Sequence, residues 1–281
     1  MKVCFSDFWT PFDPNNNFFI HIIRELYENV EVVHPEDADV MFFSVFGNEN
    51  GRYKNCKKIF FTGENVPPNL KKCDYSLTFE KNTHGGKNFR LPLWYLYIDW
   101  FDVKTYDNPQ WLIPESYLYG ENEFTLKPKD KFCAIVYGKQ IESRIKAIQN
   151  ISRYKTVEVF GKANSNRPLP DGEKYKMDLI SDYKFSLCYE NSVTPGYHTE
   201  KLLHGIVAGN IPIYYGDKTI DQDFNPSRFI NAVDMSDEEL VEKIVEIDQS
   251  EEIYKEMISQ PMFNEKVNLD GIRNFLSEVL S

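Results

Sequence analysis

The chain has 281 residues, of which 42% are hydrophobic and 15% aromatic. This length suits one large domain or two of ordinary size, and the apolar content excludes a disordered chain. The formal net charge of -11 argues against nucleic acid or an anionic membrane as the partner.

The cysteines and the N-terminus indicate the compartment. The cysteine count is odd, there is no C-x-x-C pair, and most of the five lie in apolar runs (Cys4, Cys56, Cys73, Cys133 and Cys188). This pattern predicts buried thiols in a reducing compartment, neither a disulfide framework nor a zinc site. MKVCFSDFW is too short for a signal peptide, and no apolar run approaches the roughly 20 residues of a membrane helix. We therefore expect a soluble, cytoplasmic protein.

The first half of the chain predicts several strands and one helix. Strands are expected in apolar runs bounded by polar turns, at 2–9, 30–34, 38–46, 57–63 and 74–80. A helix is expected at 15–29, where one face is apolar (Phe18, Phe19, Ile22, Ile23, Leu26 and Tyr27). Residues 89–119 are dense in aromatic side chains, which we expect to be mostly core, with stacking on a sugar as the alternative.

The second half repeats the pattern after a polar, proline-containing linker at 120–131. Strands are expected at 132–138, 157–161, 184–190 and 211–216, and helices at 140–152, 173–183 and 199–208, with a polar loop at 162–172. Ser236 and Glu239 form a capping box before the helical segment LVEKIVEI (240–247), and helices at 250–259 and 268–280 follow. The chain is therefore predicted to be α/β, with domains at 1–119 and 132–262. A C-terminal helix at 263–281 follows, with packing against the first domain left as one option.

Lys201 is the most unexpected residue of the stretch YENSVTPGYHTEKLLHGIVAGNIPIYYG (189–216). It falls in the first turn of the predicted helix at 199–208, where the helix dipole is already positive. One explanation is that the lysine and the helix N-terminus both point at an anion. The other is a solvated lysine on an exposed turn.

Glu64 and Arg144 each follow a predicted strand, where parallel α/β sheets bind their ligands. Glu64, in FFTGENVPPN, is either a turn carboxylate or a rigidly held general base in a cleft. Arg144 is either a surface arginine that pairs with Glu142 or Asp130, or a phosphate clamp with two parallel donors.

Several common motifs are missing from the sequence. It contains no G-x-G-x-x-G, no G-x-x-x-x-G-K-[ST] and no G-x-S-x-G, so dinucleotide, P-loop and hydrolase sites lack support. Two D-x-D triplets, at 37–39 and 221–223, could hold a metal but also arise by chance in an acidic chain. The histidines show no metal-ligand spacing, and His198 is expected to be a polar residue before the helix. We expect no metal site.

Three blocks of the sequence resemble the family 10 α-1,3/4-fucosyltransferases. YKFSLCYENSVTPGYHTEKLLHGIVAGNIPIYYGD resembles the family signature, and DFNPSRFINAVDM resembles the segment after it. KKIFFTGENVPPNLKKCDYSLTFEKNTHGGKNFRLPLWY resembles the upstream block of the bacterial members. The blocks run in family order from about residue 57 to 235, whereas residues 1–56 have no distinctive motif.

The resemblance implies the GT-B fold, two Rossmann-like domains facing each other across a cleft, here with a helical C-terminal tail. It implies an inverting transfer of L-fucose from GDP-β-L-fucose to an acceptor oligosaccharide or glycolipid, commonly N-acetylglucosamine of a β-galactoside in α-1,3 linkage. The proposed family base falls on Glu64. The donor-binding residues fall on Arg144, Asn191, Tyr197, Glu200 and Lys201, with Arg144 supported by one helix only.

Two features depart from the family pattern. The signature here has a proline at 195 and a histidine at 198, and the chain ends without the basic amphipathic tail of some bacterial members. We therefore expect at most peripheral membrane association.

Fixed positive charge from Lys201, Arg144 and a helix N-terminus can stabilise a departing diphosphate, so we expect a metal-independent, cofactor-free reaction. The alternatives are a different nucleotide sugar or acceptor, or a non-catalytic glycan- or nucleotide-binding protein.

Overall fold

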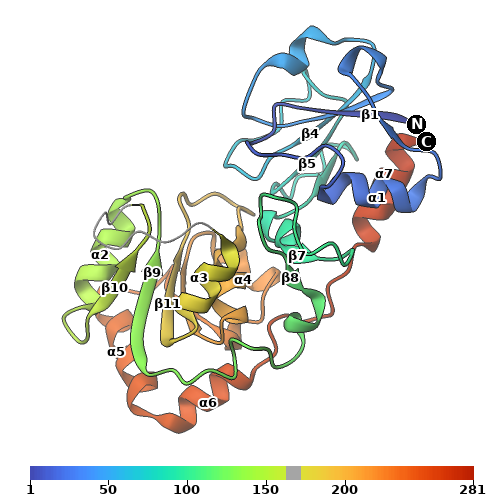
Figure 1. Ribbon diagram of the computed structural model, residues 1–281. Helices are drawn as coiled ribbons and strands as arrows, with labels where there is room; N and C mark the ends of the chain where they lie inside the picture. Colours follow the sequence, from blue (N-terminus) through green and yellow to red (C-terminus); the bar gives the residue numbers. More distant parts are fainter. Residues whose placement is uncertain (163–171) are drawn as a thin grey trace. The chain divides into compact units, whose positions relative to one another are not determined.

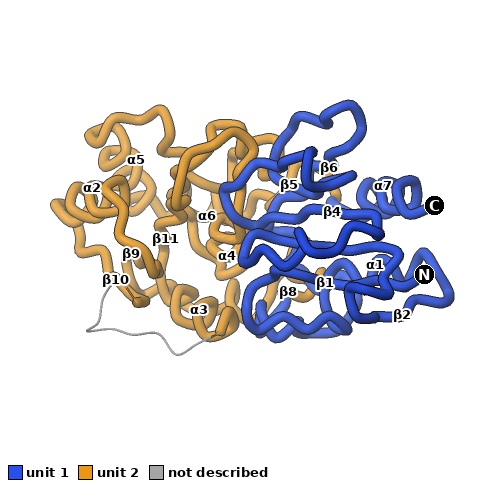
Figure 2. Tube along the Cα trace, turned by 90° about the horizontal axis from the view of Figure 1, so that it is seen from above, with its two compact units in different colours: residues 1–112, 267–281 blue, residues 113–266 orange. Residues whose placement is uncertain are grey.

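The computed structural model describes residues 1–162 and 172–281. Residues 163–171, most of the polar loop predicted at 162–172, lie outside the described part. The chain divides into two compact units: unit 1 comprises Met1–Leu112 and Val267–Ser281, and unit 2 comprises Ile113–Lys266 (Figure 2). The division falls between Leu112 and Ile113, before the boundary predicted at 119, and the C-terminal segment belongs to unit 1.

Unit 1 is built on a six-stranded sheet in which every neighbouring pair is parallel. In sheet order the strands are β2 (Glu31–Val32), β1 (Lys2–Ser6), β3 (Val40–Phe43), β4 (Lys57–Phe61), β5 (Tyr75–Thr78) and β6 (Asn88–Arg90). The order reverses between β1 and β3, as in doubly wound folds. The central strands are buried on both faces, which explains their continuous apolar runs.

Two helices from opposite ends of the chain pack together in unit 1 (Figure 1). α1 (Phe18–Leu26) begins at Asn17, whose side chain accepts hydrogen bonds from two first-turn amides. α7 (Asp270–Leu280) lies against it, and Arg273 forms an ion pair with Glu25 at 3.0 Å. Both helices bury apolar faces in the core that also contains the sheet strands. The unit further contains β7 (Ile98–Asp99) and short 3-10 helices at Pro35–Asp37, Glu49–Arg52 and Leu93–Tyr97.

Unit 2 contains a five-stranded sheet, again with parallel neighbours throughout. In sheet order the strands are β10 (Val157–Phe160), β9 (Lys131–Val136), β11 (Tyr183–Tyr189), β12 (Ile211–Tyr215) and β13 (Ile230–Asn231). β9 is the first strand of this sheet in the sequence. The next strand, β10, pairs with one edge of β9, and the following strand, β11, pairs with the other edge. The topological switch point therefore lies between β9 and β11, and ligands of such sheets bind at the carboxyl ends of the strands there.

Helices cover both faces of the unit 2 sheet (Figure 1). One face packs against α2 (Glu142–Ile151), α5 (Asp237–Gln249) and α6 (Glu251–Ser259). α3 (Glu173–Ile180) and α4 (Glu200–Val207) lie side by side on the other. The unit also contains β8 (Ile113–Pro114) and 3-10 helices at Glu115–Leu118, Lys218–Gln222 and Pro226–Arg228. Among the described residues, no helix combines the length and apolar character needed to span a bilayer.

Gly205 shows how closely α4 approaches this sheet. A Cβ atom there would lie 2.8 Å from Ser186 Oγ and 2.9 Å from Cys188 Sγ, distances that are sterically forbidden. Glycine within a helix costs about 0.5–1 kcal/mol relative to alanine, so its presence reflects this close packing.

The predicted linker at 120–131 is fixed to unit 2, because Phe124 is buried and Asn122 Nδ2 donates to the Val207 carbonyl oxygen at 3.1 Å.

Candidate functional site

Arg144 and Asn191 meet at the topological switch point of unit 2. Arg144 lies in the first turn of α2, after β9, and Asn191 follows β11. The guanidinium donates to Asn191 Oδ1 at 2.8 Å and to the carbonyl oxygens of Lys139 and Tyr189. Two of the residues assigned to donor binding by resemblance are thus in direct contact, at the edge where such sheets bind ligands.

Arg144 is buried, so the surface-arginine alternative is wrong. Its side chain is 2% exposed and forms no ion pair with Glu142 or Asp130. Burial lowers its pKa, which the negative charges of Glu190 and Glu200 partly offset. The three hydrogen bonds fix the orientation of the guanidinium and occupy part of its five N–H donors, so donors remain for a ligand.

Lys201 is paired with a buried carboxylate that the sequence reasoning did not identify. Its Nζ lies 2.9 Å from Glu190 Oε2, and the side chains are 18% and 1% exposed respectively. Nζ also donates to Thr199 Oγ1 at 2.8 Å. Burial lowers the pKa of Lys201, but Glu190 and Glu200 raise it well above its ordinary value. The solvated-lysine alternative is therefore wrong, and the anion nearest to the ammonium belongs to the chain itself.

Glu190 organises the N-terminus of α4. It follows the last residue of β11, and its carboxylate accepts hydrogen bonds from the Thr199 amide at 2.8 Å and from Thr199 Oγ1 at 2.8 and 2.7 Å. Because the Thr199 hydroxyl bonds to Glu190, it does not cap the helix, and no side-chain cap is present at that end. The first-turn amides of α4 are thus not blocked by the capping residue.

Glu200 and Tyr197 flank this pair. Glu200 is the first residue of α4, and its Oε1 lies 3.7 Å from Lys201 Nζ. Burial alone would raise the pKa of Glu200, but the positive charges of Lys201 and Lys176 are the main influences that lower it to about 2. Tyr197 is 4% exposed and close enough to Lys201 to affect the pKa of the lysine. Glu200 is therefore an anion at neutral pH.

Lys176 and His204 lie beside these residues and were not identified from the sequence. Lys176 Nζ lies 3.0 Å from His204 Nδ1. Both line a cavity of about 20 Å³ between the sheet and α3–α4, together with Arg144, Lys201 and Cys188. Burial lowers the pKa of His204 well below its ordinary value, so the imidazole is neutral. His204 follows Glu200 by four residues and shares its helix face, which is the only sequence signal for it.

His198 anchors the loop that leads into α4. Its side chain is 0% exposed, with Nδ1 2.6 Å from Asp223 Oδ2 and Nε2 3.2 Å from Asp217 Oδ2. Asp217 also accepts a hydrogen bond from the Gly196 amide at 2.7 Å. The carboxylate of Asp223, in the second D-x-D triplet, is therefore used to hold His198. Within residues 1–162 and 172–281 no cluster of three or more metal-binding side chains is found.

Glu64 lies in unit 1, after β4. Its amide donates to Thr62 Oγ1, and Thr62 Oγ1 donates back to the Glu64 carbonyl oxygen, each at 3.0 Å. The side chain is exposed, and its carboxylate has no hydrogen-bond or ion-pair partner among the described residues. A Cβ at Gly63 would lie 2.7 Å from Leu93 Cδ1, so a larger residue there would require the Leu93 side chain to move. The structure thus gives Glu64 a fixed backbone and an available carboxylate.

The sequence matches two consecutive fucosyltransferase family models. Residues 3–97 match the N-terminal domain of α-(1,3)-fucosyltransferase FucT, and residues 126–260 match the C-terminal part of glycosyltransferase family 10 (fucosyltransferase). The α-(1,3)-fucosyltransferase FucT of Helicobacter pylori is 29% identical over 300 residues, which cover 96% of this chain and 61% of that protein. The mouse GDP-fucose protein O-fucosyltransferase 3 is 30% identical over 166 residues, 55% of this chain and 31% of that protein.

Solved structures show the same fold. A crystal structure of an α1,3-fucosyltransferase with GDP-fucose superposes with a TM-score of 0.75, at 21% identity, over 100% of this chain and 90% of that chain. The predicted α/β, GT-B class is therefore confirmed. This chain spans less than two thirds of the length of the two relatives named above. Because the two family models together match most of its residues, the chain belongs to glycosyltransferase family 10, the fucosyltransferase family.

Proposed function

We propose that the protein transfers L-fucose from GDP-β-L-fucose to a hydroxyl of an acceptor glycan, with inversion at the anomeric carbon. The observation that carries the proposal is the contact between Arg144 and Asn191 at the switch point of unit 2, next to the start of α4. Family membership supports the reaction class, and the name of the H. pylori relative supports α-1,3 linkage. N-acetylglucosamine of a β-galactoside is our first choice of acceptor.

Inversion requires a single displacement and one base. The acceptor oxygen attacks the anomeric carbon of fucose while Glu64 takes its proton. The bond between that carbon and the β-phosphate oxygen breaks, and its electron pair leaves with GDP. An exposed carboxylate with no internal partner is available for this proton. No second carboxylate is needed as a nucleophile, because inversion involves no covalent intermediate.

Negative charge grows on the diphosphate as the bond breaks, and fixed cations stabilise it. The remaining donors of Arg144 and the ammonium of Lys201 fit this role, with Lys176 nearby. Asn191, held by Arg144, and Tyr197 position the nucleotide. Glu200, ionised at neutral pH, can accept a hydrogen bond from a sugar hydroxyl.

An acceptor screen with GDP-fucose tests the proposal. The panel contains N-acetyllactosamine, its β-1,3 isomer, Lewis-type precursors on lipid, and a folded peptide domain, because one relative is named a protein O-fucosyltransferase. Products are read by mass spectrometry and linkage analysis. We expect fucose in α linkage on a glycan hydroxyl. Transfer from another GDP-sugar but not from GDP-fucose, or GDP binding without transfer to any acceptor, would refute the assignment.

A further inference from the structure

Unit 2 contains a second, much larger cavity at the opposite edge of its sheet from Arg144. The cavity measures about 800 Å³, within the range of small-molecule sites. Its lining includes Lys129, Gly209 and Arg228, which come just before β9, β12 and β13 respectively. These positions mark the amino ends of parallel strands, whereas Arg144 and Asn191 lie at the carboxyl ends. The two sites are therefore separate.

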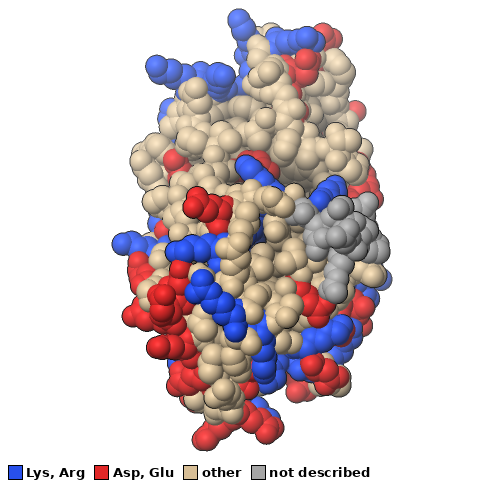
Figure 3. Space-filling view, turned by 90° about the vertical axis from the view of Figure 1, so that its left-hand side faces the viewer, with Lys and Arg blue, Asp and Glu red and all other residues tan. Residues whose placement is uncertain are grey.

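The lining is cationic in a chain that is acidic as a whole. It has five basic side chains and two acidic ones, namely Lys127, Lys129, Arg228, Lys255 and Lys266 against Glu121 and Glu265. The whole chain has a formal net charge of -11. On the face drawn in Figure 3, acidic and basic side chains are interspersed. Lys127 and Lys255 pair with Asp178 and Glu251 outside the lining, so the charge that can attract an anion comes from Arg228 and Lys266.

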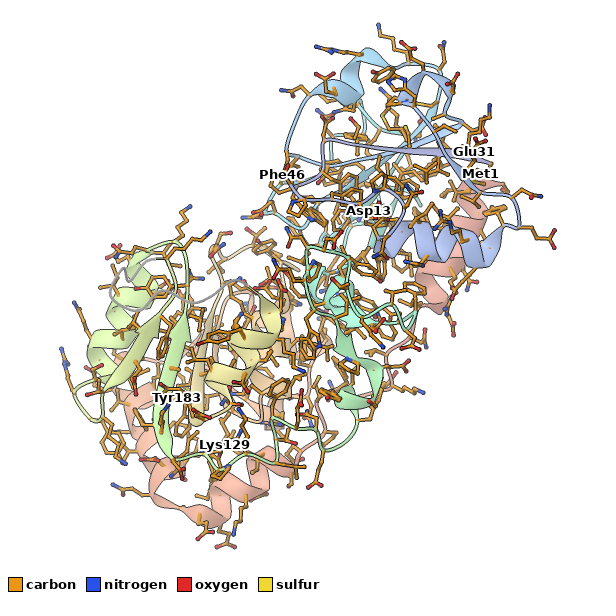
Figure 4. All side chains as sticks on the ribbon, viewed as in Figure 1. Met1, Asp13, Glu31, Phe46, Lys129 and Tyr183 are labelled. Carbon is orange, nitrogen blue, oxygen red and sulfur yellow. The ribbon has the colours of Figure 1, made fainter. Side chains whose placement is uncertain are left out.

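Lys129 has a structural role in unit 2. Figure 4 shows it near Tyr183, the first residue of β11, at the amino-terminal edge. Its ammonium donates to the carbonyl oxygens of Phe124, Ser181 and Ala208, the last two being the C-caps of α3 and α4. All three donors are used, and the cation faces the negative ends of two helices. Burial is the main cause that lowers its pKa, to about 8.

The guanidinium of Arg228, unlike the ammonium of Lys129, has few partners within the fold. Arg228 is 3% exposed, and among the described residues the only hydrogen bond of its side chain runs from Nη1 to the Asn210 carbonyl oxygen at 2.8 Å. It has no ion pair with any described carboxylate. A buried guanidinium normally has its charge and its five donors satisfied, because leaving them unsatisfied is costly. Arg228 therefore offers a preformed fork of donors at the wall of a cavity.

The rest of the lining is aromatic and apolar. The rings of Tyr119 and Phe263 lie 6.5 Å apart, and Lys266 Nζ lies 5.7 Å above the Tyr119 ring. Tyr119 is 47% exposed although it borders the cavity. Aromatic faces and one anchored cation together suit a flat or apolar body that carries an anionic group.

We propose that this cavity binds a small organic anion, an aromatic or apolar body with a phosphate or carboxylate that Arg228 receives. The inference goes beyond fucose transfer and does not depend on it. The wall segments at 117–129 and 258–266 lie close to Ile113 and Lys266, where the chain enters and leaves unit 2. A bound anion would cross-link these two segments.

Calorimetric titration of the whole chain with phenyl phosphate, benzoate and the neutral analogue benzyl alcohol tests the proposal. We expect at least one of the anions to bind with a dissociation constant of about 1 mM or lower, and the alcohol not to bind. Whichever anion binds more tightly identifies the headgroup as phosphate or carboxylate. Absence of binding by both anions at about 10 mM overturns the proposal.

Variants locate the binding. Arg228→Met should weaken the preferred anion about 10- to 100-fold, the usual effect of losing a charge-assisted hydrogen bond, and Arg228→Lys should weaken it less. Arg153→Met removes an exposed arginine elsewhere and should have no effect. Arg144→Met should also have no effect. Loss of affinity in Arg144→Met, with affinity retained in Arg228→Met, would assign the probe to the other site and overturn the proposal.

Arg228→Met could fail to fold, so two exposed positions provide an independent test. Tyr119→Ala and Lys266→Met change only the mouth of the cavity, and together they should weaken the anion about 3-fold or more through lost ring and cation contacts. Circular dichroism at the titration temperature verifies that each variant is folded. Unchanged affinity in the double variant would contradict the assignment.

Discussion

The pairing of Lys201 with Glu190 makes a prediction in which two variants both lose stability but differ in their effect on GDP binding. Both charges are largely removed from water, with 18% and 1% of their side chains exposed. Removing one member of a buried pair typically costs about 3–5 kcal/mol, because the other charge remains buried. Lys201→Met leaves the Glu190 carboxylate with only its bonds from Thr199. We expect a loss of about 3 kcal/mol, near the lower end of that range.

Glu190→Gln should cost less. The ammonium of Lys201 is the more exposed of the two charges and keeps Glu200 at 3.7 Å. Losing hydrogen bonds to a charged group costs about 1.5–3 kcal/mol, so we expect about 2 kcal/mol. In the double variant both charges are absent, and the cost should fall short of the sum by about 1.5 kcal/mol or more.

Urea unfolding of the three variants measures this coupling. All four tryptophans, Trp9, Trp94, Trp100 and Trp111, lie in unit 1, so fluorescence follows that unit and far-UV circular dichroism follows both. If fluorescence and circular dichroism change at the same urea concentration, a single free energy of unfolding describes the chain. If they change separately, the transition seen only by circular dichroism belongs to unit 2. A coupling energy below about 0.5 kcal/mol would mean that Lys201 is solvated and would refute the pairing.

GDP titration then separates a binding role from a structural one. Lys201→Met should weaken GDP about 10-fold or more, since a charge-assisted bond to phosphate is lost. Glu190→Gln should keep or tighten GDP binding, because it removes negative charge beside the proposed phosphate site. If both variants fold and lose GDP affinity equally, the Lys201–Glu190 pair has only a structural role.

The remaining predictions concern single groups. Arg144→Lys should weaken GDP about 10-fold in calorimetry, because an ammonium cannot replace the fork that joins Tyr189 and Asn191; wild-type affinity would remove Arg144 from donor binding. Glu64→Gln should lower kcat about 100-fold or more with GDP affinity nearly intact, and an unchanged kcat would exclude Glu64 as the base. The pKa of Glu200 is lowered from 4.5 to about 2 in the folded state, so its stabilisation is complete above pH 4.5 and is lost as the pH falls toward 2. Acid unfolding of Glu200→Gln should therefore be less steep in that window, and identical curves would contradict the shift. Transfer should persist in EDTA, and restoration by magnesium or manganese after its loss would contradict reliance on fixed cations alone.

Local pattern was sufficient for most of the fold. Continuous apolar runs identified the central strands β3 and β4, and the capping box at Ser236 and Glu239 is present as predicted at the start of α5. β6 and β13 were missed, since three and two residues are too short to show a period. The boundary at Leu112 was also missed, because the polar segment after it is attached to unit 2 by the buried side chains of Asn122 and Phe124.

The candidate site divides along the same line. The sequence by itself determined the family and the fold class, because long motifs, and apolar runs that alternate with helical patterns, can be read directly from the order of the residues. It also identified Lys201 as an unexpected cation at a helix N-terminus. Only the tertiary structure decided what neutralises that lysine, since Glu190 lies at a strand end 11 residues away. It also placed Arg144 against Asn191, 47 residues apart in the chain, and buried Arg228 beside a cavity. Electrostatic partners depend on distance in space and on exclusion of water, and neither can be inferred from spacing along the chain.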